Sequence, residues 1–152
     1  MIIKPHEIEK LNLSKNKFFL FYGENQGHKN QIINSKFKKI FLKNTYIFEE
    51  TEILTNINSF FDQILSRSFF EKEKLIIINR ATDKIKTILE EIIDKDIEDL
   101  VIVLNSNSLE KKSKIRSLFE KNKNTYCVPF YEDNHQTLNS IISLFFRNKK
   151  IP

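Results

Sequence analysis

Glycine, proline and cysteine are scarce in this chain of 152 residues, which contains 2, 3 and 1 of them and no tryptophan. So few glycines and prolines exclude a collagen-like or turn-rich low-complexity sequence, and a single cysteine excludes an internal disulfide. No apolar run approaches the roughly 20 residues of a membrane span, and the charged start MIIKPHEIEKL has no signal-peptide core. We therefore expect a soluble, cytoplasmic protein without membrane contact.

Cys127 lies in the apolar run TYCVPF, which is typical of a small buried hydrophobic residue. The alternative, a nucleophilic thiol, needs a base and an orienting group, and His135 is the only histidine nearby. His6, His28 and His135 have no metal-ligand spacing with one another or with Cys127. We predict no catalytic residue, no metal site and no cofactor.

Phenylalanine is abundant, with 14 residues, and supplies the core of a single domain over residues 1–152. The formal net charge is +5, and the pI is near 9.2. This balance permits contact with nucleic acid or with an acidic protein. Acids and lysines alternate along most of the chain, and the exceptions are residues 36–43 and 111–116.

Apolar runs and helical patterns alternate five times along the chain. Phe18–Tyr22 is a continuous apolar run, as in a strand buried on both faces. Further strands are predicted at 46–48, 75–78, 100–104 and 126–130. Helical apolar spacing occurs between and after these strands, at Ile32, Ile33, Phe37, Ile40 and Phe41; at Ile57, Phe60, Phe61, Ile64 and Leu65; at Ile85, Ile88, Leu89, Ile92 and Ile93; at Leu109, Ile115, Leu118 and Phe119, with Ser108 as the expected N-cap; and at Leu138, Ile141, Ile142 and Phe145.

This alternation predicts an α/β fold of three layers, with a parallel five-stranded sheet between helices, because parallel strands need crossover connections. In such a sheet, ligands bind at the carboxyl ends of the strands. The loops that follow the strands are therefore the places to look for a functional site.

The stretch FFLFYGENQGHKN, residues 18–30, stands where a P-loop NTPase carries its phosphate-binding loop. Gly23 and Lys29 occupy their places in that motif, but His28 replaces its second glycine and Asn30 its Ser or Thr. The third strand ends in Asn79 and Arg80, where the acid that holds magnesium is expected, and Asp83 lies too far along. The residues favour a degenerate P-loop.

Two interpretations of Gly23 and Lys29 stay open. In one, Gly23 gives the turn its backbone freedom and Lys29 lies on an exposed helical face. In the other, both residues contact a nucleotide. A similar choice holds for Lys111, Lys112, Lys114 and Arg116, which form either a solvated helical face or a set of phosphate contacts.

Phe69 and Phe70 are an adjacent aromatic pair between polar Ser66–Ser68 and the charged run 71–74. Adjacent helical residues point about 100° apart, so both rings cannot occupy one narrow apolar stripe. Either the pair packs in the core, or at least one ring is an exposed anchor for a pocket on a partner protein.

Three stretches together resemble the delta subunit of the bacterial DNA polymerase III clamp loader, in its amino-terminal domain. They are FFLFYGENQGHKN, SRSFFEKEKLIIINRA and LVIVLNSNSLEKKSKIRSLFEKNKNTYCVPFYEDN. The resemblance covers about residues 10–146 and rests on the order and spacing of these stretches.

The resemblance implies a P-loop NTPase fold of the AAA+ type, with strand order 5-1-4-3-2, a degenerate P-loop and no ATP hydrolysis. It also implies that Phe69 and Phe70 are a wedge that binds the sliding clamp (beta subunit) and helps to open it for loading onto primed DNA during replication. The family has an aliphatic residue before the phenylalanine, so Phe69 departs in shape.

Members of this family continue into a lid domain and a carboxyl-terminal collar domain that this chain does not include. As it stands, the chain is expected to bind the clamp without joining the loader through a collar. If the chain continues in its parent gene, the other clamp-loader subunits are expected partners, and so is primed DNA through the assembled loader. Two other classes of protein remain alternatives: a P-loop nucleotide-binding enzyme that tolerates His28 and Asn30, and a basic nucleic-acid-binding domain.

Overall fold

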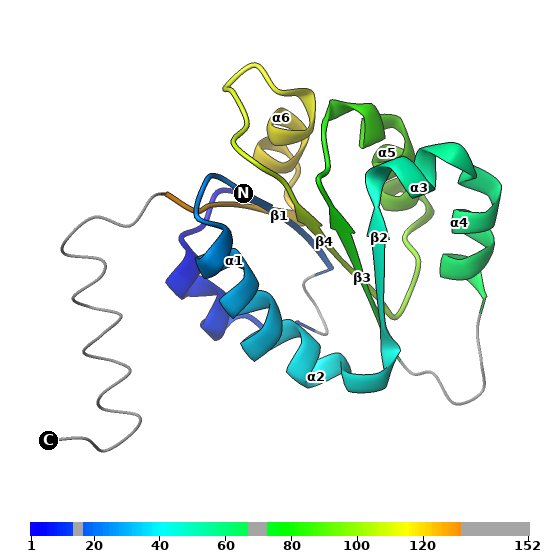
Figure 1. The fold of residues 1–152 in the computed structure, drawn as a ribbon, viewed down its shortest axis with the longest axis horizontal. Coiled ribbons are helices and arrows are strands. Elements are labelled where there is room, and N and C mark those ends of the chain that lie inside the picture. Colours follow the sequence, from blue (N-terminus) through cyan, green and yellow to red (C-terminus); the bar gives the residue numbers. More distant parts are fainter. Residues whose placement is uncertain (14–16, 67–72, 132–152) are drawn as a thin grey trace, which may run out of the picture.

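The computed structural model describes residues 1–13, 17–66 and 73–131, in which strands and helices alternate along the chain (Figure 1). The strands are β1 (Phe18–Tyr22), β2 (Thr45–Glu49), β3 (Lys74–Asn79), β4 (Leu100–Asn105) and β5 (Thr125–Pro129). The helical elements are η1 (Pro5–Lys10), α1 (Gln26–Ile32), η2 (Ile33–Lys38), α2 (Lys39–Phe41), η3 (Leu42–Asn44), α3 (Glu50–Thr55), α4 (Ile57–Leu65), η4 (Asp83–Ile85), α5 (Lys86–Lys95) and α6 (Lys114–Lys121). The predicted bounds of β1 are confirmed, and those of the other strands differ by at most one residue at either end. The predicted helix around residues 138–145 lies outside the described residues.

All five strands are parallel and form one sheet of order β2-β3-β4-β1-β5. The predicted parallel α/β sheet is confirmed, and its order is 5-1-4-3-2 when it is read from the other edge. β1 is an interior strand, because Phe19 lies opposite Val103 on β4 and opposite Tyr126 on the edge strand β5. At the outer edge of β5, Ile2 pairs with Cys127.

Side chains of β1 enter two separate core layers, one on each face of the sheet. Phe18, Leu20 and Tyr22 belong to the layer that α4, α5 and α6 cover, whereas Phe19 and Phe21 belong to the layer under η1, η2 and α2. Figure 1 shows α1 and α2 on one side of the sheet and α5 and α6 on the other. The run FFLFY therefore has no polar face, because the strand meets apolar residues in both directions.

Three side chains of the predicted helical stripes face solvent instead of the core. Ile40, Ile57 and Leu65 are 54%, 40% and 47% exposed. In the first of these helices, the buried row is Ile33 and Phe37, four residues apart, within the π-helical segment η2. A π-helical turn holds more residues than an α-helical turn. Residues four apart, such as Ile33 and Phe37, therefore lie on the same face, whereas Ile40, three residues after Phe37, is turned toward solvent.

The helix after β4 begins later than the sequence predicted. Ser113, and not Ser108, is the N-cap of α6, and its hydroxyl accepts a hydrogen bond from the backbone N–H of Arg116 at 3.4 Å. Each serine precedes an apolar helical pattern, so the sequence offers two similar start signals.

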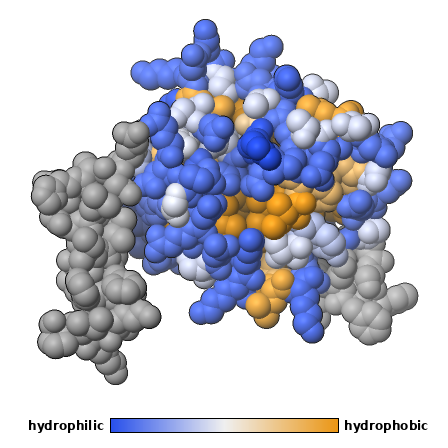
Figure 2. All heavy atoms as spheres, viewed as in Figure 1, coloured by the Kyte–Doolittle hydropathy of each residue, from blue (hydrophilic) through white to orange (hydrophobic). Residues whose placement is uncertain are grey.

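Hydrophilic side chains cover most of the face seen in Figure 2, and apolar areas lie near its centre, along its upper part and at its lower edge. Among the helices of the described ranges, none is long and apolar enough to cross a membrane.

Candidate functional site

The loop after β1 packs closely against the chain that leaves β5. Gly23 has a φ of +118°, and its N–H donates to the carbonyl oxygen of Asn107 at 3.2 Å. A Cβ at this position would lie 2.1 Å from the carbonyl oxygen of Phe130. The glycine is thus required both by its backbone angle and by this close approach, as the prediction of a turn glycine states.

Lys29 is fully buried, whereas one of its two interpretations placed it on an exposed helical face. Its Nζ donates to the carbonyl oxygen of Gly23 at 2.7 Å and to that of Ser106 at 2.6 Å. Burial lowers the pKa of Lys29 because it disfavours the charged form. The exposed-face interpretation is wrong, because α1 starts directly behind the loop and aims this residue back beneath it.

The two residues beside Lys29 are held by local contacts. The ring of His28 packs edge-on against Phe130 with ring centroids 5.1 Å apart. The side-chain oxygen of Asn30 accepts a hydrogen bond from Gln26 at 3.0 Å on the exposed side of α1. An amide therefore occupies the place where a P-loop presents a hydroxyl to magnesium.

The end of β3 offers amide and guanidinium groups in place of a carboxylate. The side chain of Asn79 accepts a hydrogen bond from Asn105 at 3.2 Å. Arg80 has a φ of +54° and pairs with Glu49 at 2.9 Å, and the hydrogen bond from Arg80 lowers the pKa of Glu49.

Asp83 accepts hydrogen bonds from the hydroxyl of Ser113 at 2.8 Å and from the N–H of Ile115 at 3.0 Å. Burial by itself would raise the pKa of Asp83, but these hydrogen bonds outweigh it and the pKa is lowered. Asp83 thus holds the first turn of α6. The carboxylate closest in sequence to the end of β3 is committed to the fold.

Two residues that the sequence analysis did not single out tie the strand ends together. Glu50 is 4% exposed and accepts hydrogen bonds from the N–H and the hydroxyl of Thr82 at 2.6 and 2.8 Å. Ser106, 1% exposed, donates its hydroxyl to the carbonyl oxygen of Ala81 at 2.8 Å and its N–H to that of Phe21 at 2.7 Å. The only signal for them in the sequence is that polar residues follow directly on apolar strands.

Basic residues 111–116 do not share one solvated face. Lys111, Lys112 and Lys114 are exposed, as predicted. Arg116 is instead partly buried: its guanidinium lies 4.9 Å from the centre of the Tyr22 ring and pairs with Glu120 at 2.8 Å. The prediction of a solvated side chain is wrong for Arg116, because the helix turns this position toward β1.

Cys127 is fully buried, as predicted, and burial raises the pKa of its thiol to about 12. A thiol with so high a pKa carries almost no thiolate near neutral pH, and the thiolate is the nucleophilic form. Among the residues that the structure describes, no three histidine, cysteine or acidic side chains gather as a metal site would require.

Phe69 and Phe70 lie outside the described residues, but the two sides of their segment are tied together. Lys74, at the start of β3, is 8% exposed. Its Nζ donates to the carbonyl oxygen of Gln63 at 3.2 Å, to the hydroxyl of Ser66 at 3.3 Å and to the carbonyl oxygen of Ser66. The last turn of α4 is thus held against the first residue of β3.

No protein-family model and no curated protein sequence matches this chain.

Proposed function

We propose that this chain is a non-catalytic, AAA+-like domain of the clamp-loader delta type, which binds a DNA sliding clamp through Phe69 and Phe70 and helps to open it. The parallel sheet of order β2-β3-β4-β1-β5 supports the proposal, because it is the order that the sequence resemblance implies.

The position of Lys29 is the observation that carries the non-catalytic part of the proposal. In a working P-loop, the lysine reaches the β- and γ-phosphates from the loop. Here the ammonium of Lys29 donates to two backbone carbonyls, those of Gly23 and Ser106, and has no exposed surface. Moving it to a phosphate would leave two carbonyl oxygens without a donor, at a cost of about 1–3 kcal/mol for each buried group.

Lys74 supports the clamp-binding part of the proposal. The hydrogen bonds of Lys74 to Gln63 and Ser66 hold together the two sides of the segment that contains Phe69 and Phe70.

We expect the double substitution Phe69→Ala/Phe70→Ala to weaken binding to the cognate sliding clamp by about 30-fold or more, as for a hot spot of about 2 kcal/mol. Titration of the clamp by surface plasmon resonance or fluorescence measures the change. The matched control is Leu42→Ala, which removes an apolar side chain that is 75% exposed on η3. Unchanged clamp affinity in the double variant, with normal thermal stability, would sink the wedge assignment.

We further expect magnesium-ATP to leave the melting temperature of the chain unchanged, because a ligand raises that temperature only when it binds the native state. Differential scanning fluorimetry with and without millimolar magnesium-ATP is the measurement. A saturable rise, with ATP consumed over time, would favour the P-loop enzyme over the clamp-binding domain.

A further inference from the structure

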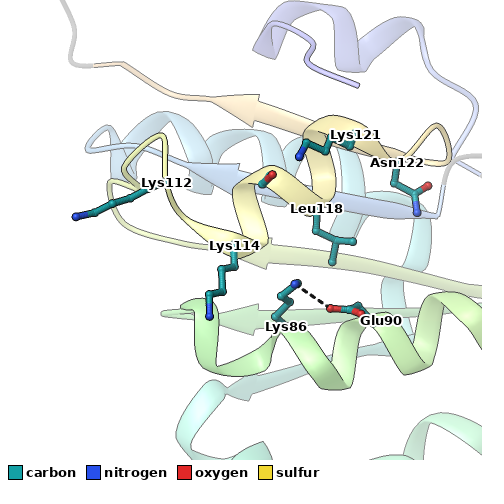
Figure 3. A pocket seen from close by; sticks show the side chains of 8 residues that line it. Lys86, Glu90, Lys112, Lys114, Leu118, Lys121 and Asn122 are labelled. Atoms are coloured by element: carbon teal, nitrogen blue, oxygen red, sulfur yellow. Dashed lines mark ion pairs between the residues drawn. The ribbon is translucent and has the colours of Figure 1, made fainter.

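A lysine-lined groove runs between α5 and α6, and the loop that connects β4 to α6 contributes Lys112 to it. It has a volume of about 500 Å³, and Lys86, Lys112, Lys114 and Lys121 contribute to its walls. In Figure 3, Lys86 and Glu90 of α5 face α6, and Lys114 and Leu118 project from α6 toward them. We call this the α5–α6 groove.

The charge of the groove is strongly one-sided. The described part of the chain contributes four lysines and a single carboxylate to its lining, and that carboxylate, of Glu90, lies 3.3 Å from Lys86. Lys112 pairs with Glu110 at 3.3 Å, but both side chains are more than two-thirds exposed, and such pairs contribute about 1 kcal/mol or less. Within the described ranges, no carboxylate forms an ion pair with Lys114 or Lys121, although Lys114 lies close enough to Asp83 to help lower the pKa of that carboxyl. The groove therefore attracts anions.

The spacing of the lysines fits a polymer of phosphates. Lys114 and Lys121 are seven residues apart on α6, a rise of about 10 Å along the helix, and Ser117 lies between them in the same lining. Phosphates of one duplex strand repeat about every 3.4 Å along its axis, so the row from Lys114 to Lys121 spans about three of them. A single small anion would meet only part of this row.

The composition of the groove distinguishes nucleic acid from an acidic protein. Protein interfaces are anchored by aromatic, arginine and aliphatic side chains and are depleted of lysine at their centres. Among the residues that the structure describes, one apolar side chain, Leu118, lines the groove, and neither an aromatic residue nor an arginine does. It has no ring on which an unpaired base could stack and no guanidinium that could read a base edge.

We propose that the α5–α6 groove binds the sugar-phosphate backbone of duplex nucleic acid without reading its sequence. Lys114 and Lys121 make the principal phosphate contacts, Ser117 donates between them, and Lys86 and Lys112 extend the positive surface. The contact is separate from the proposed clamp contact and does not depend on it.

The test is fluorescence anisotropy of the full chain with labelled duplex DNA of roughly 20 base pairs, in two unrelated sequences and at several salt concentrations. With four phosphate contacts we expect the two sequences to bind equally and affinity to fall about 150-fold between 50 and 200 mM salt. The variant Lys114→Gln/Lys121→Gln keeps two of the four contacts. Its DNA affinity should fall only about 12-fold over the same range of salt, and at low salt it should bind more weakly than the wild type.

The matched control is Lys39→Gln/Lys43→Gln, which removes two exposed lysines from α2 and η3 and changes the net charge equally. It should keep the binding and salt dependence of the wild type. The substitution Glu90→Gln should change DNA affinity in the opposite direction. It removes the only carboxylate among the described residues of the groove, so it should tighten DNA binding about 2- to 5-fold. All three variants change exposed or half-exposed side chains, and their melting temperatures verify the fold.

Three outcomes would overturn the inference. If Lys114→Gln/Lys121→Gln and Lys39→Gln/Lys43→Gln lose DNA affinity equally, the DNA is attracted only by the net charge of the protein and not by the groove. Tighter binding of single-stranded DNA than of duplex would exclude backbone recognition of a duplex. Equal competition by poly-glutamate of matched charge would assign the groove to an acidic protein. Sliding-clamp titration of Lys114→Gln/Lys121→Gln, expected to match the wild type, keeps this result separate from the clamp proposal.

Discussion

Replacing Gly23 by alanine should lower the free energy of unfolding by about 3 kcal/mol or more, the largest effect expected of any single methyl group in this chain. At this residue the backbone has a φ of +118°, which L-residues rarely adopt, and the new Cβ would lie 2.1 Å from the carbonyl oxygen and 2.8 Å from the carbonyl carbon of Phe130. Both contacts are with backbone, so no side chain can rotate away. To relieve the clash, the loop after β1 must move away from the end of β5. This movement weakens the hydrogen bond that the N–H of Phe130 donates to the carbonyl oxygen of Tyr22 at 2.8 Å.

The only other glycine of the chain is the matched control. Gly27 lies in α1, and an added Cβ there would meet nothing closer than the side-chain oxygen of Asn25 at 3.8 Å. Gly27→Ala should raise stability by about 0.5 kcal/mol, because alanine loses less backbone entropy in a helix. Urea denaturation of the two variants measures both effects. Equal stabilities for the two alanine variants would contradict the role assigned to Gly23.

Lys29→Ala should destabilise the domain by about 2–4 kcal/mol. The substitution removes two hydrogen bonds from a charged donor, leaves the carbonyls of Gly23 and Ser106 without it, and empties the space of the buried stem. The control is Lys39→Ala, an exposed lysine on α2, for which a change within about 0.5 kcal/mol is expected. Urea denaturation with circular dichroism is the measurement. If the two substitutions cost the same, Lys29 is not buried in solution.

The pH dependence provides a second test of Lys29. Burial lowers the pKa of this lysine below its ordinary value of 10.5. At pH values between the lowered pKa and 10.5, the lysine is protonated in the unfolded chain and deprotonated in the folded chain. The contribution of Lys29 to the free energy of unfolding therefore rises with pH in this range, and it is lost as the pH falls through the lowered pKa. The stability difference between wild type and Lys29→Ala should therefore widen as pH rises toward 10.5.

Other groups act in the opposite direction on the whole protein. Burial raises the pKa of Cys127 and that of Tyr22 to about 12, so the unfolded chain loses these protons first and stability falls as pH rises above about 9. Both groups are present in wild type and in Lys29→Ala. Their contribution cancels in the difference between the two proteins, which isolates Lys29.

The pattern of apolar residues was sufficient to predict the layers of this fold. Phe18–Tyr22 is apolar at every position, and such a run can only be satisfied between two core layers. The regular face of Ile85, Ile88, Leu89 and Ile92 is buried as predicted. The same reasoning was wrong for Ile40 and Leu65, because it assumes uniform α-helical geometry and does not say where the neighbouring element stops.

The candidate site was only half predictable. The sequence located the loop and showed that His28 and Asn30 depart from a phosphate-binding motif, since a motif depends on residue type and spacing. It did not show that Lys29 is buried or that Glu50 holds Thr82. Both interactions join segments distant in sequence: Lys29 and Ser106 are 77 residues apart, and Glu50 and Thr82 are 32 apart.

The sequence by itself therefore determined the strands, the parallel sheet and the departure of His28 and Asn30 from the phosphate-binding motif, because each depends on local residue type and periodicity. Only the tertiary structure decided what the polar side chains do. β1 lies between β4 and β5, which brings the end of β4 beneath the loop of Gly23 and gives Lys29 two backbone acceptors. The ammonium enclosed there donates to the carbonyl oxygens of Gly23 and Ser106, and these hydrogen bonds stabilise the strand ends.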